Sequence, residues 1–404
     1  MAFSPIITRL YGPEAFGLLG TFTAILSVVI PIAALTYPIA IVLPKEDNNA
    51  RGLARLSLYL ALMISLLVGG VFLVGDQALA KLLRVEAISA YLLLIPVAMF
   101  LDSLRQIMEQ WLIRKKQFKI SARVEVSQSL IVNLSKTGVG FVHPSGAALI
   151  VLTTLGYALF AAQLWLAERR WAAPDERISA PVEDKQNLRA LAHRHRDFPL
   201  YRAPQITVNA ISQAAPVLLL ASFFGAAVAG LYTLSRTAMS APAHLLGNSV
   251  GNVFFAQIAE AVNDGKNPIP YLHRATAGAF AVAFLPFLTI IIWGGPIFAF
   301  VFGVQWYEAG VYAQWVAIWL LFSLAARPVI ATIPVVNMQG YFLALETVFT
   351  VLKIGGLVIG ALLFNSPLVA VALYCLASTA LYISLYGSIY LRLRKSDDLS
   401  APSY

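Results

Sequence analysis

The sequence predicts an all-α polytopic membrane protein in which two pseudo-repeated helical lobes surround a central cavity. Three observations lead to this fold class. Hydrophobic residues make up 59% of the 404-residue chain and charged residues only 12%, with a mean hydropathy of +0.75, whereas soluble domains carry about 25% charged residues. Long apolar segments alternate with short polar ones. A short glycine-containing motif also occurs twice, each time before a long apolar segment.

The apolar segments are long enough to cross a membrane as helices, which need about 20 residues each. They lack the strict alternation that barrel strands show, so helices are favoured over strands. Eleven spans are predicted, near 15–43, 52–74, 88–112, 120–142, 146–167, 200–223, 227–257, 271–294, 309–335, 342–364 and 367–390.

The polar loops differ in charge between the two predicted sides of the membrane. Of the 29 Lys and Arg residues, 21 fall in the C-terminal tail and in the loops on one side, whereas the opposite loops carry only Arg9, Lys81 and Arg84. Because Lys and Arg concentrate in cytoplasmic loops, the cation-rich side and the C terminus are predicted to be cytoplasmic. This concentration of Lys and Arg in the cytoplasmic loops explains the net charge of +9, so no nucleic-acid partner is predicted.

The repeated motif predicts two similar halves. The stretch TRLYGPEAFGLLGTF at 8–22 and the stretch SFFGAAVAGLYTLS at 222–235 align with a constant offset of 213, which pairs Gly12 with Gly225 and Gly17 with Gly230. Transporters are commonly built from such repeats, with the substrate path between them. The predicted division is an N-terminal lobe at 1–167, a cytoplasmic loop at 168–202 and a C-terminal lobe at 203–404.

The two predicted halves differ in their number of spans. The second half has six spans and the first has five, so symmetry predicts that the first helix of a twelve-helix plan is missing before Arg9. The loop between the halves ends in RHRDFPLYRAP, which mixes basic and aromatic residues. Such a segment suits the surface of an anionic leaflet, and a solvated linker is the alternative.

Several classes of protein are excluded by residues that the chain lacks. Its single cysteine, Cys375, rules out a disulfide framework or a cysteine-based metal site, and no metal or cofactor is predicted. A membrane enzyme that acts on lipid-linked sugars would present acid–base residues in its outer loops. Those loops are short, His143 is their sole histidine, and no phosphate-binding glycine loop is found. The protein is therefore predicted not to be an enzyme.

Five cations fall inside predicted spans, where each costs about 2.5–3.5 kcal/mol at mid-helix. Arginine can donate two parallel hydrogen bonds to phosphate oxygens. The candidates for binding an anionic substrate headgroup are therefore Arg236, Arg105, Arg327, Lys353 and Lys136. Three acidic residues are candidates for coupling to protons or sodium: Asp102, Glu109 and Glu346. Snorkelling or pairing across helices is the alternative reading of each cation.

The spacing of these charges predicts local contacts. Asp102 and Glu109 lie at i−3 and i+4 from Arg105, within reach of ion pairing on one helix face. Glu346 and Lys353 are seven residues apart, which again places them on one face.

A polar stripe follows Arg236 at steps of four residues. Its further members are candidates for lining a cavity: Ser240, His244, Asn248 and Asn252. Three consecutive members share one helix face, although five do not, because each step drifts by about 40°. For His244, titration and a hydrogen-bonded packing role are both open. The equivalent positions of the first half lack this chemistry, so the lobes are predicted not to be functionally equivalent: Thr23, Ser27, Pro31, Leu35 and Ile39.

Four stretches in order along the chain carry a family resemblance: SPIITRLYGPEAFGLLGTF, IAIVLPKEDNNA, RDFPLYRAPQ and VGNVFFAQIAEA. With them the chain resembles the polysaccharide flippases of the multidrug/oligosaccharidyl-lipid/polysaccharide exporter superfamily, of the O-antigen or lipopolysaccharide type. The resemblance implies a flippase of the bacterial inner membrane that moves polyprenyl-pyrophosphate-linked, here undecaprenyl-linked, oligosaccharides by alternating access. The alternative is a drug or small-molecule antiporter of the same superfamily, whose site would favour acidic residues over arginine.

Overall fold

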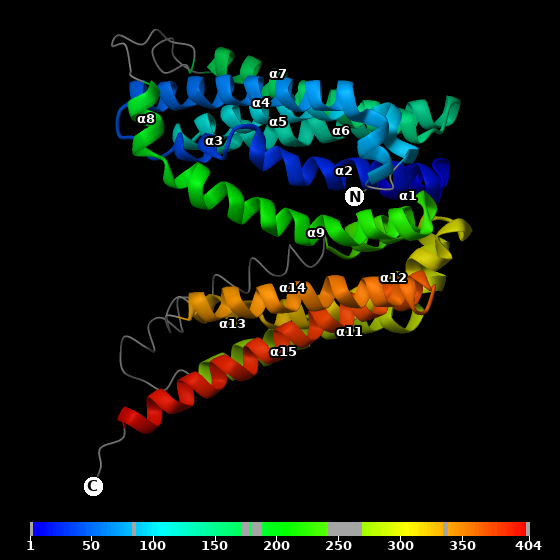
Figure 1. Ribbon diagram of the computed structural model, residues 1–404. Helices are drawn as coiled ribbons and strands as arrows, with labels where there is room; N and C mark the ends of the chain where they lie inside the picture. Colours follow the sequence, from blue (N-terminus) through cyan, green and yellow to red (C-terminus); the bar gives the residue numbers. More distant parts are fainter. Residues whose placement is uncertain are drawn as a thin grey trace. The chain divides into compact units, whose positions relative to one another are not determined.

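The computed structural model describes residues 3–82, 86–171, 178, 188–240, 269–333 and 338–400. Within these ranges every regular element is a helix (Figure 1), which confirms the predicted fold class. The longer helices of the first half are α2 (Pro13–Ala33), α4 (Asp47–Leu82), α5 (Leu94–Arg114), α6 (Phe118–Val142), α7 (Gly146–Trp171) and α9 (Ala203–Phe224). Those of the second half are α11 (Ile269–Phe302), α12 (Tyr307–Ala325), α14 (Gln339–Leu362) and α15 (Pro367–Ser400).

Short helical elements connect these long helices. They are α1 (Ser4–Leu10), α3 (Tyr37–Ala40), η1 (Glu86–Tyr91), α8 (Leu188–Arg194), the π-helical turn η3 (Phe198–Arg202), η4 (Val304–Trp306) and α13 (Arg327–Thr332). A further helical segment covers 226–240. The predicted span at 227–257 therefore lies only partly within the described residues.

Eight helical spans within the described ranges are long and apolar enough to cross a membrane, so the chain is a multi-pass membrane protein. The predicted spans near 88–112 and 120–142 also form helices, α5 and α6, but these two are not among the eight. Both carry charged residues in their interior, Asp102, Arg105 and Glu109 in α5 and Lys136 in α6, which lower their hydropathy.

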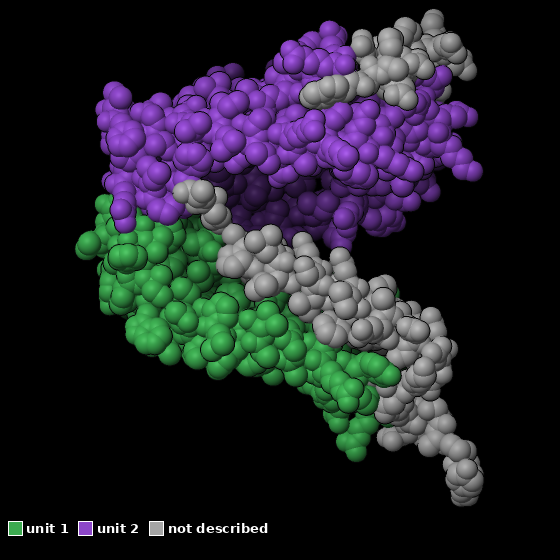
Figure 2. Space-filling view, turned by 180° about the vertical axis from the view of Figure 1, so that it is seen from behind, with its two compact units in different colours: residues 1, 231–404 green, residues 2–230 purple. Residues whose placement is uncertain are grey.

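The described residues divide into two compact units (Figure 2). We call residues 2–230 the N-terminal unit, and residues 231–404 with residue 1 the C-terminal unit. In the N-terminal unit α9 packs along α2, and α5 and α7 pack together. In the C-terminal unit α11 packs against α12 and α14 against α15. The lobe boundaries predicted from the sequence, with a loop at 168–202, stay a prediction.

Four buried apolar clusters lie within the described residues of the N-terminal unit, and two of them are the largest. The first is built around Phe22, Leu26 and Met99 and joins α2, α5 and α7. The second lies around Trp111 and Tyr37 and also takes up Leu191 of α8. The fully buried side chain of Trp111 packs where α5 ends, so this cluster fixes the ends of α4 and α5 against the short helices α3 and α8.

The end of α2 anchors the last part of the polar segment that precedes α9. Leu35 and Thr36 adopt left-handed backbone angles, with φ of 49° and 57°, which turn the chain sharply after the helix. The Thr36 hydroxyl donates to the carbonyl of Phe198 at 3.2 Å, and the Tyr37 hydroxyl donates to the carbonyl of Ala192 at 3.1 Å. These bonds attach residues 192 and 198 to the N-terminal unit.

The two copies of the repeated motif pack directly on each other. A Cβ atom added to Gly17 would lie 1.7 Å from the carbonyl oxygen of Ala226, and one added to Gly230 would lie 1.9 Å from the carbonyl oxygen of Pro13. Pro13 and Ala226 are related by the same offset of 213 as Gly17 and Gly230. The contact is therefore symmetric, and glycine is required at both positions because the two backbones touch there.

Replacing Arg114 with alanine is expected to lower the free energy of unfolding by about 1–3 kcal/mol. This side chain pairs with Asp47 at 3.0 Å and donates to the carbonyl oxygens of Ile41 and Lys45 at 3.3 and 3.1 Å, so it closes the turn before α4. Thermal unfolding in detergent measures the loss. Lys119→Ala, at an exposed position of α6, is the matched control, and equal melting temperatures for the two variants would contradict the prediction.

Candidate functional site

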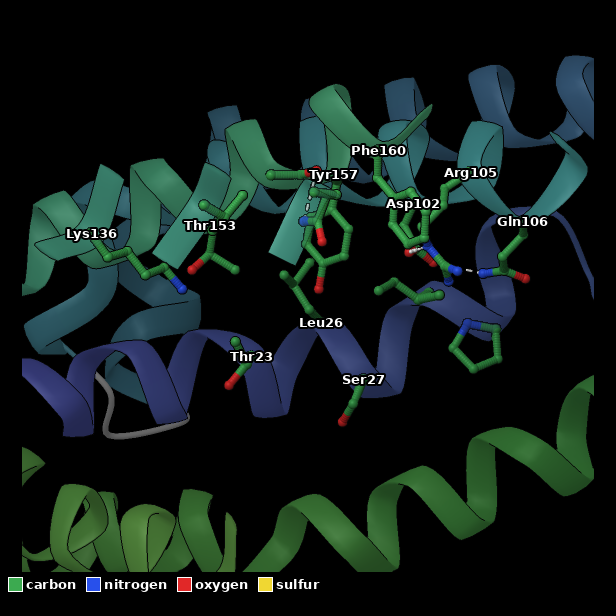
Figure 3. A pocket seen from close by; sticks show the side chains of 15 residues that line it. Thr23, Leu26, Ser27, Asp102, Arg105, Gln106, Lys136, Thr153, Tyr157 and Phe160 are labelled. Carbon is green, nitrogen blue, oxygen red and sulfur yellow. Dashed lines mark hydrogen bonds and ion pairs between the residues drawn. The ribbon is translucent and has the colours of Figure 1, made fainter. Parts of the chain in front are cut away.

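A polar cavity of about 540 Å³ lies inside the N-terminal unit. Figure 3 shows its side chains, which come from α2, α5, α6 and α7. The lining residues are Thr23, Leu26, Ser27, Ile30, Pro31, Asp102, Arg105, Gln106, Gln128, Val132, Lys136, Thr153, Gly156, Tyr157 and Phe160. The cavity therefore brings together three of the predicted site residues, Asp102, Arg105 and Lys136.

Arg105 is held between two carboxylates on its own helix. Its Nε lies 2.6 Å from Asp102 Oδ1, and its Nη1 lies 2.5 Å from Glu109 Oε2. The i−3 and i+4 pairing predicted from the spacing is thus confirmed. Asp102 is only 3% exposed, and its second oxygen accepts a hydrogen bond from Gln106 Nε2 at 2.7 Å. Two negative charges surround one positive charge, so this network carries a net charge of −1 rather than the expected positive charge.

The Arg105 guanidinium also has an apolar neighbour. Its Cζ atom lies 5.6 Å from the centre of the Phe160 ring, a cation–π contact that adds to the two ion pairs. The side chain is thus fixed on three sides, and its geometry at the cavity wall is set by α5 and α7 together.

Lys136 supplies the other charge of the cavity, from α6. Its backbone is fixed because the Tyr11 hydroxyl donates to the Lys136 carbonyl at 2.9 Å. A Cβ atom on nearby Gly140 would lie 2.7 Å from the Tyr11 ring, so glycine there permits this contact. Among the described residues no carboxylate lies within ion-pair distance of the Lys136 ammonium group. A cation inside a membrane helix is costly unless an anion or water solvates it, so the Lys136 ammonium group needs one or the other.

Neutral polar side chains line the rest of the cavity and were missed by the sequence analysis. The cavity has Lys136 toward one end and Arg105 and Gln106 toward the other, with Tyr157 and Phe160 between them (Figure 3). Hydroxyl groups of Thr23, Ser27 and Thr153 also line it. Each donates to a carbonyl of its own helix, at 2.9, 2.7 and 2.7 Å, and keeps lone pairs for accepting from a ligand.

The first-half equivalents of the polar stripe were predicted to lack its chemistry, and the functional difference between the lobes stays a prediction. The structure adds that three of these positions, Thr23, Ser27 and Pro31, line the cavity. The helix proline and two hydroxyls therefore face the same space as Asp102 and Lys136. No signal from one helix alone reveals this, since each helix contributes only a few polar residues.

The remaining predicted site residues that the structure describes lie in the C-terminal unit. Arg236 is half-buried in the segment 226–240, where the Ser240 hydroxyl donates to the Arg236 carbonyl at 2.7 Å. Lys353 is 8% exposed in α14, and Glu346 of the same helix lies beyond ion-pair distance from it. Arg327 begins α13. His244, Asn248 and Asn252 lie outside the described residues, and the functional roles of all these residues stay predictions.

No group of three or more His, Cys, Asp or Glu side chains in the described ranges is arranged to hold a metal ion.

Known structures share the fold of this helix bundle. The chain is similar to an inward-facing multidrug resistance MATE family transporter of the MOP superfamily, with a TM-score of 0.79, 14% identity and coverage of 99% of this chain and 95% of that one. It is also similar to the lipid II flippase MurJ in an inward closed conformation, with a TM-score of 0.71, 12% identity and coverage of 97% and 86%. These likenesses define the fold class.

The family follows from the sequence. A model of the polysaccharide biosynthesis protein family matches residues 6–311, and the chain belongs to that family. No curated protein sequence matches the chain. The predicted resemblance to polysaccharide flippases of this superfamily is thereby confirmed at the level of family and fold.

Replacing Asp102 with asparagine is expected to lower the free energy of unfolding by about 1–3 kcal/mol, because it removes a buried carboxylate from the half-buried Arg105. Glu109→Gln is the matched comparison on the same arginine. Since the Glu109 side chain is 36% exposed, its replacement is expected to lose less than about 1 kcal/mol. Thermal melts of both variants in detergent show which substitution lowers the stability more. A larger loss for Glu109→Gln would contradict the prediction that Asp102 is the more important partner of Arg105.

Proposed function

We propose that this protein is a flippase that moves a polyprenyl-pyrophosphate-linked oligosaccharide across the bacterial inner membrane for lipopolysaccharide, O-antigen or exopolysaccharide synthesis. Membership of the polysaccharide biosynthesis family supports the class of cargo, and the transporter fold supports movement rather than catalysis. The observation that carries the proposal is a polar, ligand-sized cavity within membrane helices, in which the Lys136 ammonium group has no anion among the described residues.

The chemistry of the cavity suits such a cargo. A pyrophosphate supplies the anion that Lys136 lacks, and charge-assisted hydrogen bonds to it are roughly twice as strong as neutral ones. Sugars present hydroxyl groups that both donate and accept. Asp102 and Gln128 would bind such hydroxyls, and the faces of Tyr157 and Phe160 offer flat apolar surfaces to a sugar ring. Anion binding and glycan binding would then occur at different ends of one cavity.

Transport by alternating access would use the remaining candidates as well. In this cycle the headgroup would be contacted by Arg236, Arg327 and Lys353 while the protein changes from inward-open to outward-open. The movement would be coupled to protons or sodium by Asp102, Glu109 or Glu346. In this proposal the cation-rich loops and the C terminus lie in the cytoplasm, where the lipid-linked cargo is assembled.

A translocation assay in proteoliposomes tests the function. A fluorescent undecaprenyl-pyrophosphate oligosaccharide is supplied in one leaflet, and its exposure in the other leaflet is followed over time. Wild-type protein is expected to expose it faster than protein-free liposomes, and Arg236→Ala is expected to lose this acceleration while remaining folded. Exposure at the protein-free rate, with several glycans and with an imposed ion gradient, would refute the proposal.

The second candidate function is a drug or small-molecule antiporter. It is favoured by one observation, the net negative charge of the Asp102–Arg105–Glu109 network at the cavity wall, which suits a cationic drug. The same proteoliposomes discriminate between the two functions. Accumulation of a cationic dye that depends on an ion gradient, without lipid translocation, would favour the antiporter.

A further inference from the structure

The segment that leads into α9 forms one helical piece on the N-terminal unit. Helical backbone hydrogen bonds join α8 to η3: the His195 amide donates to the Leu191 carbonyl at 3.1 Å, and the Phe198 amide donates to the His195 carbonyl at 3.1 Å. α8 packs against α4, and η3 packs against α3 and α9 (Figure 1). The segment therefore presents two defined faces, one toward the unit and one away from it.

The inward face of this segment is apolar and uncharged. Four of its side chains belong to or pack against the cluster around Trp111 and Tyr37, at the spacing of one helix face. They are Leu188, Leu191, Ala192 and Phe198. Burial lowers the pKa of His195 below its ordinary value, so the ring is neutral at pH 7, and its centre lies 6.4 Å from that of the Phe198 ring. This face holds the segment in place.

The opposite face combines exposed cations with exposed apolar side chains. The segment from 188 to 202 has four arginines and one acid, Asp197. All four arginines are exposed: Arg189, Arg194, Arg196 and Arg202. Leu200 is 59% exposed and Tyr201 is 72% exposed. We call the following residues the outward face: Arg194, Arg196, Leu200, Tyr201 and Arg202.

Charge and apolar surface are neighbours on the outward face. The Leu200 amide donates to the Arg196 carbonyl at 3.2 Å, so these two residues lie one helical turn apart. Among the described residues no carboxylate lies within ion-pair distance of Arg194 or Arg196. The guanidinium of Arg202 donates to the amide oxygen of Gln205 at 3.0 Å, which is a neutral partner. The positive charge of this face is therefore not neutralised by acids of the described residues.

The start of α9 sets the depth of this face in the membrane. The apolar span that contains α9 begins at Phe198, so η3 lies where this helix leaves the bilayer, on the side that the charge bias predicts to be cytoplasmic. Tyrosine concentrates at this depth, and anionic lipids of the cytoplasmic leaflet attract clustered arginines. An aqueous surface accounts for the arginines alone, whereas a layer of lipid headgroups also accounts for the adjacent Leu200 and Tyr201.

We propose that the outward face is a binding site for an anionic phospholipid of the cytoplasmic leaflet. Its arginines donate to the phosphate oxygens, and its leucine and tyrosine contact the upper part of the acyl chains. The bound lipid holds in place the segment whose carbonyls accept from Thr36 and Tyr37, and so stabilises the turn after α2. Of the two interpretations that the sequence leaves open, a segment on a leaflet and a solvated linker, this is the first. The inference does not depend on the identity of the cargo.

Photocrosslinking in nanodiscs tests the site without any cargo. A phosphatidylglycerol analogue with a photoreactive group near its headgroup is added at a low fraction of the lipid, so that its yield follows occupancy, and crosslinked peptides are identified by mass spectrometry. The wild type is expected to crosslink within residues 193–202. The double variant Arg194→Gln with Arg196→Gln is expected to lower this yield roughly tenfold, the effect of about 1.4 kcal/mol.

Three further double variants separate charge from packing. Leu200→Ser with Tyr201→Ser removes the apolar contact and is also expected to lower the yield. Arg194→Lys with Arg196→Lys keeps the charge and is expected to keep most of it. The matched control, Lys119→Gln with Arg123→Gln, removes two cations from exposed positions of α6 and is expected to leave the yield unchanged.

Four outcomes would overturn the inference. Equal yields from phosphatidylglycerol and phosphatidylcholine analogues would show that the lipid charge is not recognised. Wild-type yields in both Arg194→Gln with Arg196→Gln and Leu200→Ser with Tyr201→Ser would show that the lipid binds elsewhere. Loss of the yield in the lysine pair together with its melting transition would assign the arginines a structural role. Displacement of the lipid analogue by soluble polyglutamate would indicate an acidic protein as the partner.

Discussion

Lys136→Met is expected to slow the translocation of a lipid-linked oligosaccharide at least tenfold while the protein stays folded. The ammonium group lines the cavity of the N-terminal unit and has no carboxylate at ion-pair distance among the described residues, so its removal breaks no internal ion pair. Methionine keeps the length and the apolar part of the side chain. A charge-assisted hydrogen bond to pyrophosphate contributes about 1.5–3 kcal/mol, and each 1.4 kcal/mol corresponds to a factor of ten.

The measurement is the proteoliposome assay, with melting temperature recorded for every variant. Lys136→Arg is expected to keep most of the rate, because it preserves the charge. Lys119→Met makes the same chemical change at an exposed position of α6 and is expected to match the wild type. A wild-type rate for Lys136→Met would show that the pyrophosphate does not depend on this cation. A rate lost together with the melting transition would instead assign Lys136 a structural role.

Gly17→Ala and Gly230→Ala are each expected to abolish the native packing of the N-terminal unit. The added methyl group would lie 1.7 Å or 1.9 Å from a backbone carbonyl oxygen, and a backbone cannot rotate away as a side chain can. Overpacking of a core costs about 1–3 kcal/mol when side chains relax, and a clash with backbone on both helices is expected to exceed this. The expected result is loss of monodisperse protein in detergent, or a melting temperature lower by about 5 °C or more, roughly the change that over 4 kcal/mol gives for 404 residues.

The control for this prediction lies in the same motif. Gly12→Ala places its methyl group in open space, with no atom within 4 Å, and the backbone of Gly12 has an ordinary φ of −75°. Gly12 is the N-cap of α2, where alanine is less favourable than glycine, so the expected loss is about 1 kcal/mol and well below that of the two clashing variants. Equal stability of Gly17→Ala, Gly230→Ala and Gly12→Ala would mean that the two motifs do not touch.

The sequence predicted the fold class because hydrophobic length is a local property. Each apolar run had to become a helix to satisfy its backbone in lipid, and even α5 and α6, with charges inside, were predicted from their length. The contacts of Arg105 with Asp102 and Glu109 were predicted for the same reason, since i−3 and i+4 spacing fixes them within one helix. Glu346 and Lys353 share a face but are not in contact, because seven residues correspond to two turns of helix.

The cavity itself could not be predicted in this way. Thr23, Gln128, Thr153 and Tyr157 come from three helices, and each is an unremarkable polar residue in its own segment. Only the packing of α2, α6 and α7 brings them together with Lys136. A second cavity, within the C-terminal unit between α11, α12 and α15, was missed for a related reason, because Phe280 and Phe322 in its wall appear in the sequence as ordinary apolar residues of spans. Side chains that meet across helices depend on rotation and tilt, which hydropathy does not encode.

The contact between the two motifs has the form of an isologous interface. In a twofold homodimer, residue i of one subunit meets residue j of the other and residue j of the first meets residue i of the second. Here position 17 meets position 226 and position 230 meets position 13, all within one polypeptide. Such a contact couples the evolution of the two motifs. A residue larger than glycine in one motif would clash with the backbone of the other. Compensating change would have to occur at Ala226 for Gly17 or at Pro13 for Gly230, in the other half of the same gene.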